Sequence, residues 1–240
     1  MTRLFLTSYQ KSGTHQIMPA LGIHPHIVDR SGNSLSMISK YIDHEIPVGQ
    51  DGIEITCKSL RTFENRAFGH VSYLKEYVEA IQTTPTKVIF NVRDPRDVIV
   101  AEYHNLYKKM PEQRGWPDFI LKEGMYLSDS DDPISHLIDF AIRWERWLGW
   151  MDEEFVYTVR FEDLRTKGME TCTSLISWIR SFGIVISDPH NIYKRLAPTR
   201  DNPTFRKGLI GEWKDVFSDE HKKKAERVLG HIITRLGYEI

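Results

Sequence analysis

Four consecutive residues near the amino terminus, Lys11-Ser12-Gly13-Thr14, have the types and spacing of a site that binds an anion. They follow the apolar residues 4–9 and precede residues 15–21, whose pattern suits a helix, so we expect a tight turn between a strand and a helix. Such a turn points backbone N–H groups at one spot, where the Lys11 ammonium adds a full positive charge. We call this segment the anion loop and predict that it binds a phosphate or sulfate group.

The surroundings of the anion loop narrow its chemistry. The upstream glycine of the ATP-binding motif G-x-x-x-x-G-K-[ST] is absent, which weakens an ATPase interpretation. His15 lies directly beside the loop, at a position from which it can contact the molecule that carries the bound anion. The alternative is that Gly13 only supplies an unusual backbone angle and that Lys11 is solvated.

A second candidate anion site follows the predicted strand at residues 87–92. Asp94 and Pro95 are a helix cap and a first helical residue, so Arg93 is expected at the carboxyl end of that strand. Ligands of open α/β sheets bind beyond these ends, which predicts that Arg93 shares a crevice with the anion loop. Arginine can bind phosphate through two parallel N–H bonds. The alternative is an ion pair between Arg93 and Asp97 that caps the helix.

A third basic segment, residues 205–214, precedes the last predicted helix. It contains three cations and two glycines, including Arg206, Lys207 and Gly208. Glycines let the backbone approach a ligand closely, and adjacent cations make a dense positive site. The alternative is a solvated basic loop.

Strands alternate with helices along the chain, which predicts an α/β fold, a three-layer sandwich with a central, mainly parallel sheet. Strands are predicted at residues 4–9, 53–57, 87–92 and 155–161. Helices are predicted at residues 13–21, 73–82, 95–108, 134–150, 169–182 and 219–236. Residues 110–133 and 183–203 are expected to be irregular excursions.

Composition predicts a single globular domain over residues 1–240. The net charge of −1 provides no broad basic field, so a nucleic acid is not expected as a partner. Cys57 and Cys172 are far apart and have no metal-ligand spacing, which argues against a disulfide scaffold or a metal site and favours the cytoplasm. The amino-terminal apolar run is too short for a signal peptide or a membrane span.

Taken together and in order, the three basic segments resemble the cytosolic sulfotransferase family, whose members use 3′-phosphoadenosine 5′-phosphosulfate (PAPS) as the donor. The segments are the anion loop, Arg93-Asp94-Pro95-Arg96-Asp97-Val98, and Arg206-Lys207-Gly208-x-x-Gly211-x-Trp213-Lys214. The resemblance runs from about residue 4 to residue 217. It implies a P-loop-like, nucleotide-binding transferase.

The resemblance also implies a role for each segment. The anion loop would hold the 5′-phosphosulfate of PAPS, and Lys11 would stabilise the leaving group. The 3′-phosphate of PAPS, or of the product PAP, would bind Arg93, Arg206, Lys207 and Gly208. The acceptor would be a hydroxyl, less readily an amine, of a small molecule or saccharide, and no metal is implied. The oligomeric state is left open.

His70 is the candidate general base. The family has a histidine about two dozen residues before the 3′-phosphate arginine, at the end of a strand, and His70 precedes Arg93 by 23 positions. An imidazole with an ordinary pKa near 6.5 can accept the proton of an attacking hydroxyl near neutral pH. The alternative is a structural histidine that is hydrogen-bonded to the backbone.

Four positions depart from the family pattern. Gln10 replaces a proline, Gln16 replaces a tryptophan that stacks on adenine, Ala101 replaces a serine that contacts the 3′-phosphate, and Phe161 replaces a tyrosine. Two other functions therefore stay open beside sulfuryl transfer: a nucleotide-dependent kinase of the P-loop class, and a non-catalytic nucleotide-binding module.

Overall fold

The computed structural model of the 240-residue chain describes residues 2–23, 50–63, 65–104, 132–196 and 207–240. The chain divides into two compact units. The first unit comprises Met1–Val92 and Arg146–Phe205, and the second unit comprises Arg93–Glu145 and Arg206–Ile240. The single-domain organisation over residues 1–240 stays a prediction.

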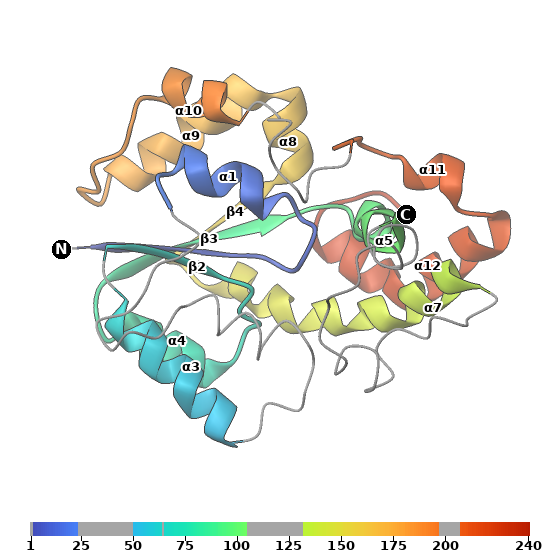
Figure 1. Cartoon of the computed structure of the whole chain (residues 1–240), viewed down its shortest axis with the longest axis horizontal. Coiled ribbons are helices and arrows are strands. Elements are labelled where there is room, and N and C mark those ends of the chain that lie inside the picture. Colours follow the sequence, from blue (N-terminus) through green and yellow to red (C-terminus); the bar gives the residue numbers. More distant parts are fainter. Residues whose placement is uncertain (1, 24–49, 64, 105–131, 197–206) are drawn as a thin grey trace, which may run out of the picture. The chain divides into compact units, whose positions relative to one another are not determined.

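A parallel sheet of four strands, in the order β2-β1-β3-β4, is the centre of the first unit (Figure 1). The strands are β1, Arg3–Thr7; β2, Arg66–Gly69; β3, Thr86–Val92; and β4, Val156–Arg160. Leu6 of β1 lies opposite Phe68 of β2 and Ile89 of β3, and every residue of β1 is buried. Continuous burial is typical of a parallel sheet with both faces covered, and the predicted α/β class is confirmed.

Helices cover both faces of this sheet and complete its three layers (Figure 1). One face carries α1, Thr14–Ala20; α8, Phe161–Thr166; α9, Gly168–Arg180; and α10, Pro189–Arg195. The other face carries α3, Gln50–Thr62, and α4, Lys75–Gln82. Strand side chains alternate between the faces, so Leu4 and Leu6 join the core with α1 and α9. Phe5 lies 5.7 Å from Phe63, between ring centroids.

The prediction of a strand at residues 53–57 is wrong, because these residues belong to α3. Their alternating pattern is short, whereas Thr56, Leu60 and Phe63 are buried three or four positions apart, which is helical spacing. The sheet's remaining strand is β2, which pairs with β1 at one edge and was not predicted. It has four residues and ends in glycine, a residue depleted in strands.

Residues 134–150, predicted as one helix, form two elements. The first is α7, Pro133–Phe140, and the second is a 3₁₀ helix, Ala141–Asp152. Trp144, Trp147 and Trp150 are buried and lie three positions apart, which matches the three-residue period of a 3₁₀ helix.

The remaining predictions differ from the structure mainly in short elements. α8 was not predicted, and α10 lies inside the segment 183–203 that was expected to be irregular. The predicted helix at residues 95–108 is described as α5, Pro95–Tyr103. Residues 105–108 lie outside the described residues, as does nearly all of the predicted excursion at 110–133.

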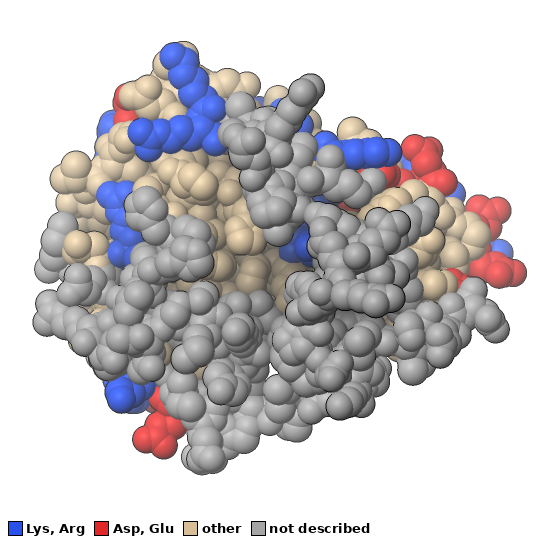
Figure 2. Space-filling model, in the orientation of Figure 1, with Lys and Arg blue, Asp and Glu red and all other residues tan. Residues whose placement is uncertain are grey.

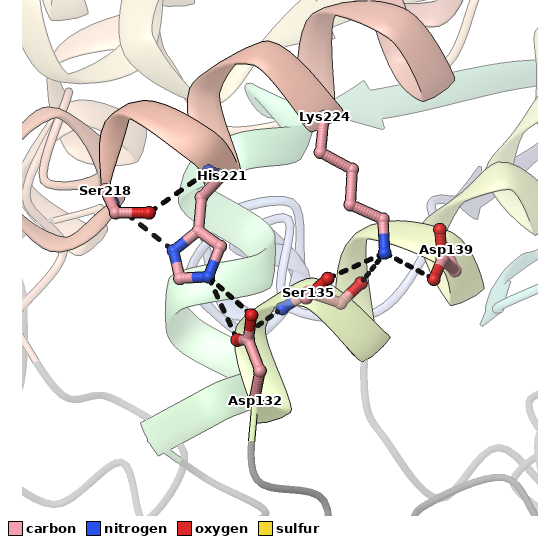
Figure 3. Close-up of polar contacts among 6 residues, drawn as sticks. All are labelled: Asp132, Ser135, Asp139, Ser218, His221 and Lys224. Carbon is pink, nitrogen blue, oxygen red and sulfur yellow. Dashed lines mark hydrogen bonds and ion pairs between the residues drawn. The ribbon is translucent and has the colours of Figure 1, made fainter.

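The second unit is helical and packs α5, α7 and α12, Asp219–Arg235, against one another. The short helix α11, Trp213–Val216, packs against α5. Figure 3 shows the polar contacts that join α7 to the amino-terminal turns of α12, made by Asp132, Ser135, Asp139, Ser218, His221 and Lys224. The His221 Nε2 atom lies 2.9 Å from a carboxylate oxygen of Asp132, and Lys224 Nζ donates to Ser135 Oγ at 2.7 Å.

This cluster contains a serine, a histidine and an aspartate, but its bonding is that of a helix cap (Figure 3). The Ser218 hydroxyl accepts from the backbone N–H of His221, and His221 Nδ1 accepts from the backbone N–H of Ser218. Since the imidazole does not contact the hydroxyl, it cannot activate Ser218 as a nucleophile. The cluster fixes α12 to α7.

Several Lys and Arg side chains lie close together on the visible surface of the first unit (Figure 2). Figure 2 shows Lys and Arg side chains in blue over the region of α9 and α10, where Arg180, Lys194 and Arg195 are exposed. This grouping fits a chain with a net charge of −1, in which any positive site must be local. Among the helices that the structure describes, none is long and apolar enough to cross a membrane.

Candidate active site

The anion loop lies in the first unit, between β1 and α1, and its backbone is unusual at two residues. Lys11 has a φ of 59° and Gly13 a φ of 90°, both in the left-handed region. For a residue other than glycine this conformation costs about 1–2 kcal/mol. Ser12 and Thr14 are buried, while Lys11 stays partly exposed. A lysine kept in a strained position next to solvent points to a role for its charge.

Three contacts hold the anion loop in this shape. Asn91 of β3 donates from Nδ2 to the carbonyl of Ser12 at 2.7 Å, and the Ser12 hydroxyl donates to the carbonyl of Tyr9 at 2.8 Å. The ring of Phe161 covers Gly13, where an added Cβ would lie 2.5 Å from Cδ2 of that ring. Gly13 therefore has the structural role that the alternative interpretation gave it, and its conformation shapes the turn that is predicted to bind an anion.

The electrostatics beside the loop concern His15. Its side chain has an exposed edge, and its ring centroid lies 6.4 Å from that of Phe68. Loss of hydration, followed by electrostatic interaction with His70 and with the Lys11 ammonium, lowers the pKa of His15 from 6.5 to about 4. His15 is therefore neutral near pH 7 and can offer a bound anion a neutral N–H group.

The structure brings His70 to the anion loop. Thr7 and Gly69 lie opposite each other in β1 and β2, so Ser8 and His70 leave the sheet at the same edge. His70 Nδ1 lies 2.8 Å from the backbone carbonyl oxygen of Ser8. A carbonyl can only accept, so Nδ1 carries the hydrogen and Nε2 of the neutral ring is an acceptor. This hydrogen bond thus favours the tautomer that a base acting through Nε2 requires.

The backbone next to His70 is also fixed. The Thr7 hydroxyl donates to the carbonyl of Val71 at 2.9 Å and accepts from its N–H at 3.2 Å. Trp150 Nε1 donates to the same carbonyl at 2.9 Å. These bonds tie Val71 to the end of β1 and to Trp150, and so fix the backbone that follows His70.

In the second unit, Arg93 and Asp94 begin α5. Asp94 caps this helix by accepting from the N–H of Arg96 at 2.9 Å, and it forms an ion pair with the Arg96 guanidinium at 2.8 Å. Arg93 is buried and donates from Nη2 to the carbonyl of Leu209 at 2.9 Å. The side chain that caps α5 is Asp94, while the charge of Arg93 acts on Asp97, as the alternative interpretation expects of a pair between them.

The glycine-containing segment after residue 206 is anchored by Asp97. The Asp97 carboxylate is buried and accepts from the N–H groups of Gly211 at 2.7 Å and Trp213 at 3.1 Å. Loss of hydration raises the pKa of Asp97, although these backbone bonds and the charge of Arg93 oppose the shift. The backbone of this segment is therefore anchored at Gly211 and Trp213, while the side chains of Lys207, Leu209 and Ile210 are exposed.

The predicted 3′-phosphate residues of this segment are described only in part. Gly208 has a φ of 60°, so glycine suits the bend there. Lys207 Nζ is exposed and lies 3.8 Å from the Glu212 carboxylate. Arg206 lies outside the described residues.

Sequence reasoning did not identify Ser8, Asn91 or the anchoring role of Asp97. A signal existed for Asn91, because an amide inside the apolar residues 88–92 must find a hydrogen-bond partner when buried. The contact between Ser8 and His70 depends on the pairing of β1 with β2, and β2 was not predicted.

We predict that glycine is preferred over alanine at position 11. Lys11→Gly and Lys11→Ala both remove the charge, but only glycine adopts a positive φ freely, so the Gly variant should be more stable by about 1 kcal/mol. Chemical denaturation measures this difference in the free energy of unfolding. The same pair at Lys223, exposed within α12, is the control. There the Gly variant should be less stable by about 1 kcal/mol. The same preference at both positions would contradict this account of the loop.

We also predict that Asp97→Asn loosens the glycine-containing segment. An amide offers one acceptor oxygen and turns an NH₂ group toward the second N–H, so the free energy of unfolding should fall by about 1–3 kcal/mol. Hydrogen exchange at the amides of Gly211 and Trp213 should become at least tenfold faster, as expected when about 1.4 kcal/mol of local protection is lost. Asp215→Asn, at an exposed position, is the matched control. Unchanged exchange in the Asp97 variant would refute the anchor.

Comparison with known proteins agrees with this geometry. Residues 1–179 match the sulfotransferase domain family. Human Sulfotransferase 6B1 is 24% identical over 231 residues, which cover 90% of this chain and 71% of the relative. Flavonol 3-sulfotransferase of Flaveria bidentis is 21% identical, over 94% of this chain and 80% of the relative. The crystal structure of mouse sulfotransferase SULT7A1 complexed with PAP has the same fold, with a TM-score of 0.58 and 18% identity over 97% of this chain and 85% of that one. The resemblance found in the three basic segments is confirmed, and this chain belongs to the sulfotransferase family.

Proposed function

We propose that this chain transfers a sulfuryl group from PAPS to a hydroxyl group, less readily an amine, of a small molecule or saccharide. The observation that carries the proposal is the meeting of His70 with the anion loop, where Nδ1 of the ring lies 2.8 Å from the Ser8 carbonyl oxygen. A base in a defined tautomer beside a cationic anion loop is what sulfuryl transfer to a hydroxyl needs. PAP is bound in mouse SULT7A1, a protein of the same fold.

The donor end of the reaction belongs to the anion loop. In the proposal Lys11, Ser12, Gly13 and Thr14 hold the 5′-phosphosulfate, and the neutral His15 adds an N–H contact. As the bond between sulfur and the bridging oxygen breaks, negative charge grows on the 5′-phosphate. The Lys11 ammonium stabilises that charge more in the transition state than in the ground state, and this difference raises the rate.

The acceptor end of the reaction belongs to His70. Nε2 accepts the proton of the acceptor hydroxyl as its oxygen attacks sulfur and forms the new S–O bond. The electron pair of the breaking S–O bond leaves with the 5′-phosphate of PAP. The hydrogen bond from Nδ1 to the Ser8 carbonyl oxygen stabilises the positive charge that His70 gains in this step.

The 3′-phosphate of the donor is assigned to Arg93, Arg206, Lys207 and Gly208. Arg93 and the segment of residues 207–213 support this assignment, since hydrogen bonds of the buried Arg93 and Asp97 side chains hold this segment in place. Gln16 occupies the position where the family has its adenine-stacking tryptophan. The buried Nε2 atom of Gln16 has no hydrogen-bond partner among the described residues and is available to the adenine of PAPS.

A cytoplasmic location is also part of the proposal. Cys57 and Cys172 are both buried and carry free thiols. Free thiols are typical of proteins that work in a reducing compartment.

We predict that His70→Ala lowers the turnover number by about 10²–10⁴-fold, the usual contribution of a general base. The affinity for PAP should stay within about threefold, because the loop contacts that bind phosphate are kept. PAP release from PAPS with a panel of phenols, alcohols and amines measures turnover, and calorimetry measures PAP binding. His190→Ala, at an exposed position on α10, is the control. Normal turnover with weakened PAP binding would sink the assignment, and no change in either would favour a non-catalytic module.

A further inference from the structure

One buried hydroxyl lies between the anion loop and the proposed base. Ser8 is fully buried, and its Oγ atom lies 2.5 Å from the Thr14 hydroxyl and 3.2 Å from His70 Nδ1. Thr14 belongs to the loop that is proposed to hold the phosphosulfate, and His70 is the proposed base. Ser8 itself belongs to neither group, and its hydroxyl is not used by the mechanism above.

The directions of the hydrogens along these contacts follow from the donors and acceptors present. His70 Nδ1 carries its hydrogen, because the Ser8 carbonyl oxygen at 2.8 Å can only accept. The Ser8 hydroxyl oxygen must therefore present a lone pair to Nδ1, and its own hydrogen is directed to Thr14 Oγ1. Thr14 then accepts from Ser8, so its own hydrogen is available to an anion bound in the loop. The donation runs in one direction, from His70 through Ser8 and Thr14 toward the anion.

The opposite direction produces the wrong form of the base. A Ser8 hydroxyl that donated to His70 Nδ1 would require an unprotonated Nδ1 and a hydrogen on Nε2. Nε2 of that ring could not take the proton of the hydroxyl group that attacks sulfur. Its Nδ1 lone pair would also face the carbonyl oxygen of Ser8, which is unfavourable.

We infer that Ser8 is a positioning residue that couples donor binding to the tautomer of His70, an inference that rests on the proposed function. An anion that accepts from Thr14 fixes the Thr14 hydrogen, which in turn fixes the Ser8 hydrogen and leaves a lone pair for Nδ1–H. Donor binding thereby favours the ring with a free Nε2 before the acceptor arrives. Since coupling between two sites is reciprocal, the same tautomer favours anion binding by an equal factor.

The test uses the full chain labelled with ¹⁵N at histidine, with PAP as the probe ligand. In the wild type, the ¹⁵N shifts of His70 should report the Nδ1–H tautomer, and PAP should increase its population. Ser8→Ala removes the hydroxyl but keeps the backbone carbonyl, so the increase caused by PAP should disappear. The turnover number should fall about three- to tenfold, the effect of one hydrogen bond, while the dissociation constant of PAP changes less than threefold. Ser59→Ala, which removes another buried hydroxyl in the same unit, should leave both kinetics and ¹⁵N shifts unchanged.

Thr14→Val breaks the same connection at its other end and keeps the test decisive if Ser8→Ala does not fold. It should weaken PAP binding and also abolish the response of the His70 tautomer to PAP. A response equal to that of the wild type in either variant overturns the role of Ser8. Equal losses of turnover and PAP affinity in Ser8→Ala, with an unchanged tautomer response, also overturn it. Failure of the proposed function gives a different result, because PAP would then not bind the wild type or His70→Ala would keep its turnover.

Discussion

The left-handed turn between β1 and α1 is the constraint on which the proposed chemistry depends. Of the three residues 11–13, Lys11 and Gly13 have a positive φ, and Lys11 is not a glycine. The turn is held because Ser12 and Thr14 are buried and because the Ser12 carbonyl accepts a hydrogen bond from a side chain of the sheet. Asn91 donates to Ser12, and the Phe161 ring occupies the space beside Gly13. A loop fixed in this way can present a cation without reorganisation when an anion arrives, which is the condition for electrostatic catalysis.

The second unit uses similar physics with a different group. Its glycine-containing segment is held by the buried carboxylate of Asp97, which accepts from two backbone N–H groups. Arg96 adds a bidentate pair with Asp94 and lies 3.9 Å over the ring of Trp213. In both units a buried side chain fixes a backbone segment, and the cation stands at the edge of that segment. This arrangement separates the residues that give stability from those that are proposed to bind the ligand.

The class of the fold and the positions of the cationic segments could be predicted from the sequence. The contacts that hold those segments in shape could not. Strand–turn–helix patterns and the Asp94-Pro95 start of α5 depend on neighbouring residues and were predicted correctly. α3 was mistaken for a strand because residues 53–57 are a short apolar, β-branched run, whereas the helical spacing of its buried face extends beyond that run. The contacts of Ser8 with His70 and of Asp97 with Gly211 join residues 62 and 114 positions apart. Such contacts follow from strand register and helix packing, which local patterns do not contain.

The proposed function requires that this chain bind a nucleotide that carries a 3′-phosphate as well as a charged 5′ end. The most direct measurement compares the melting temperature of the full chain with adenosine 3′,5′-bisphosphate and with ATP at equal concentrations. A ligand that binds only the folded state at about 100 times its dissociation constant adds about 2.7 kcal/mol of stability. The account predicts a clear increase with the bisphosphate and a smaller one with ATP. Equal or stronger stabilisation by ATP would contradict it.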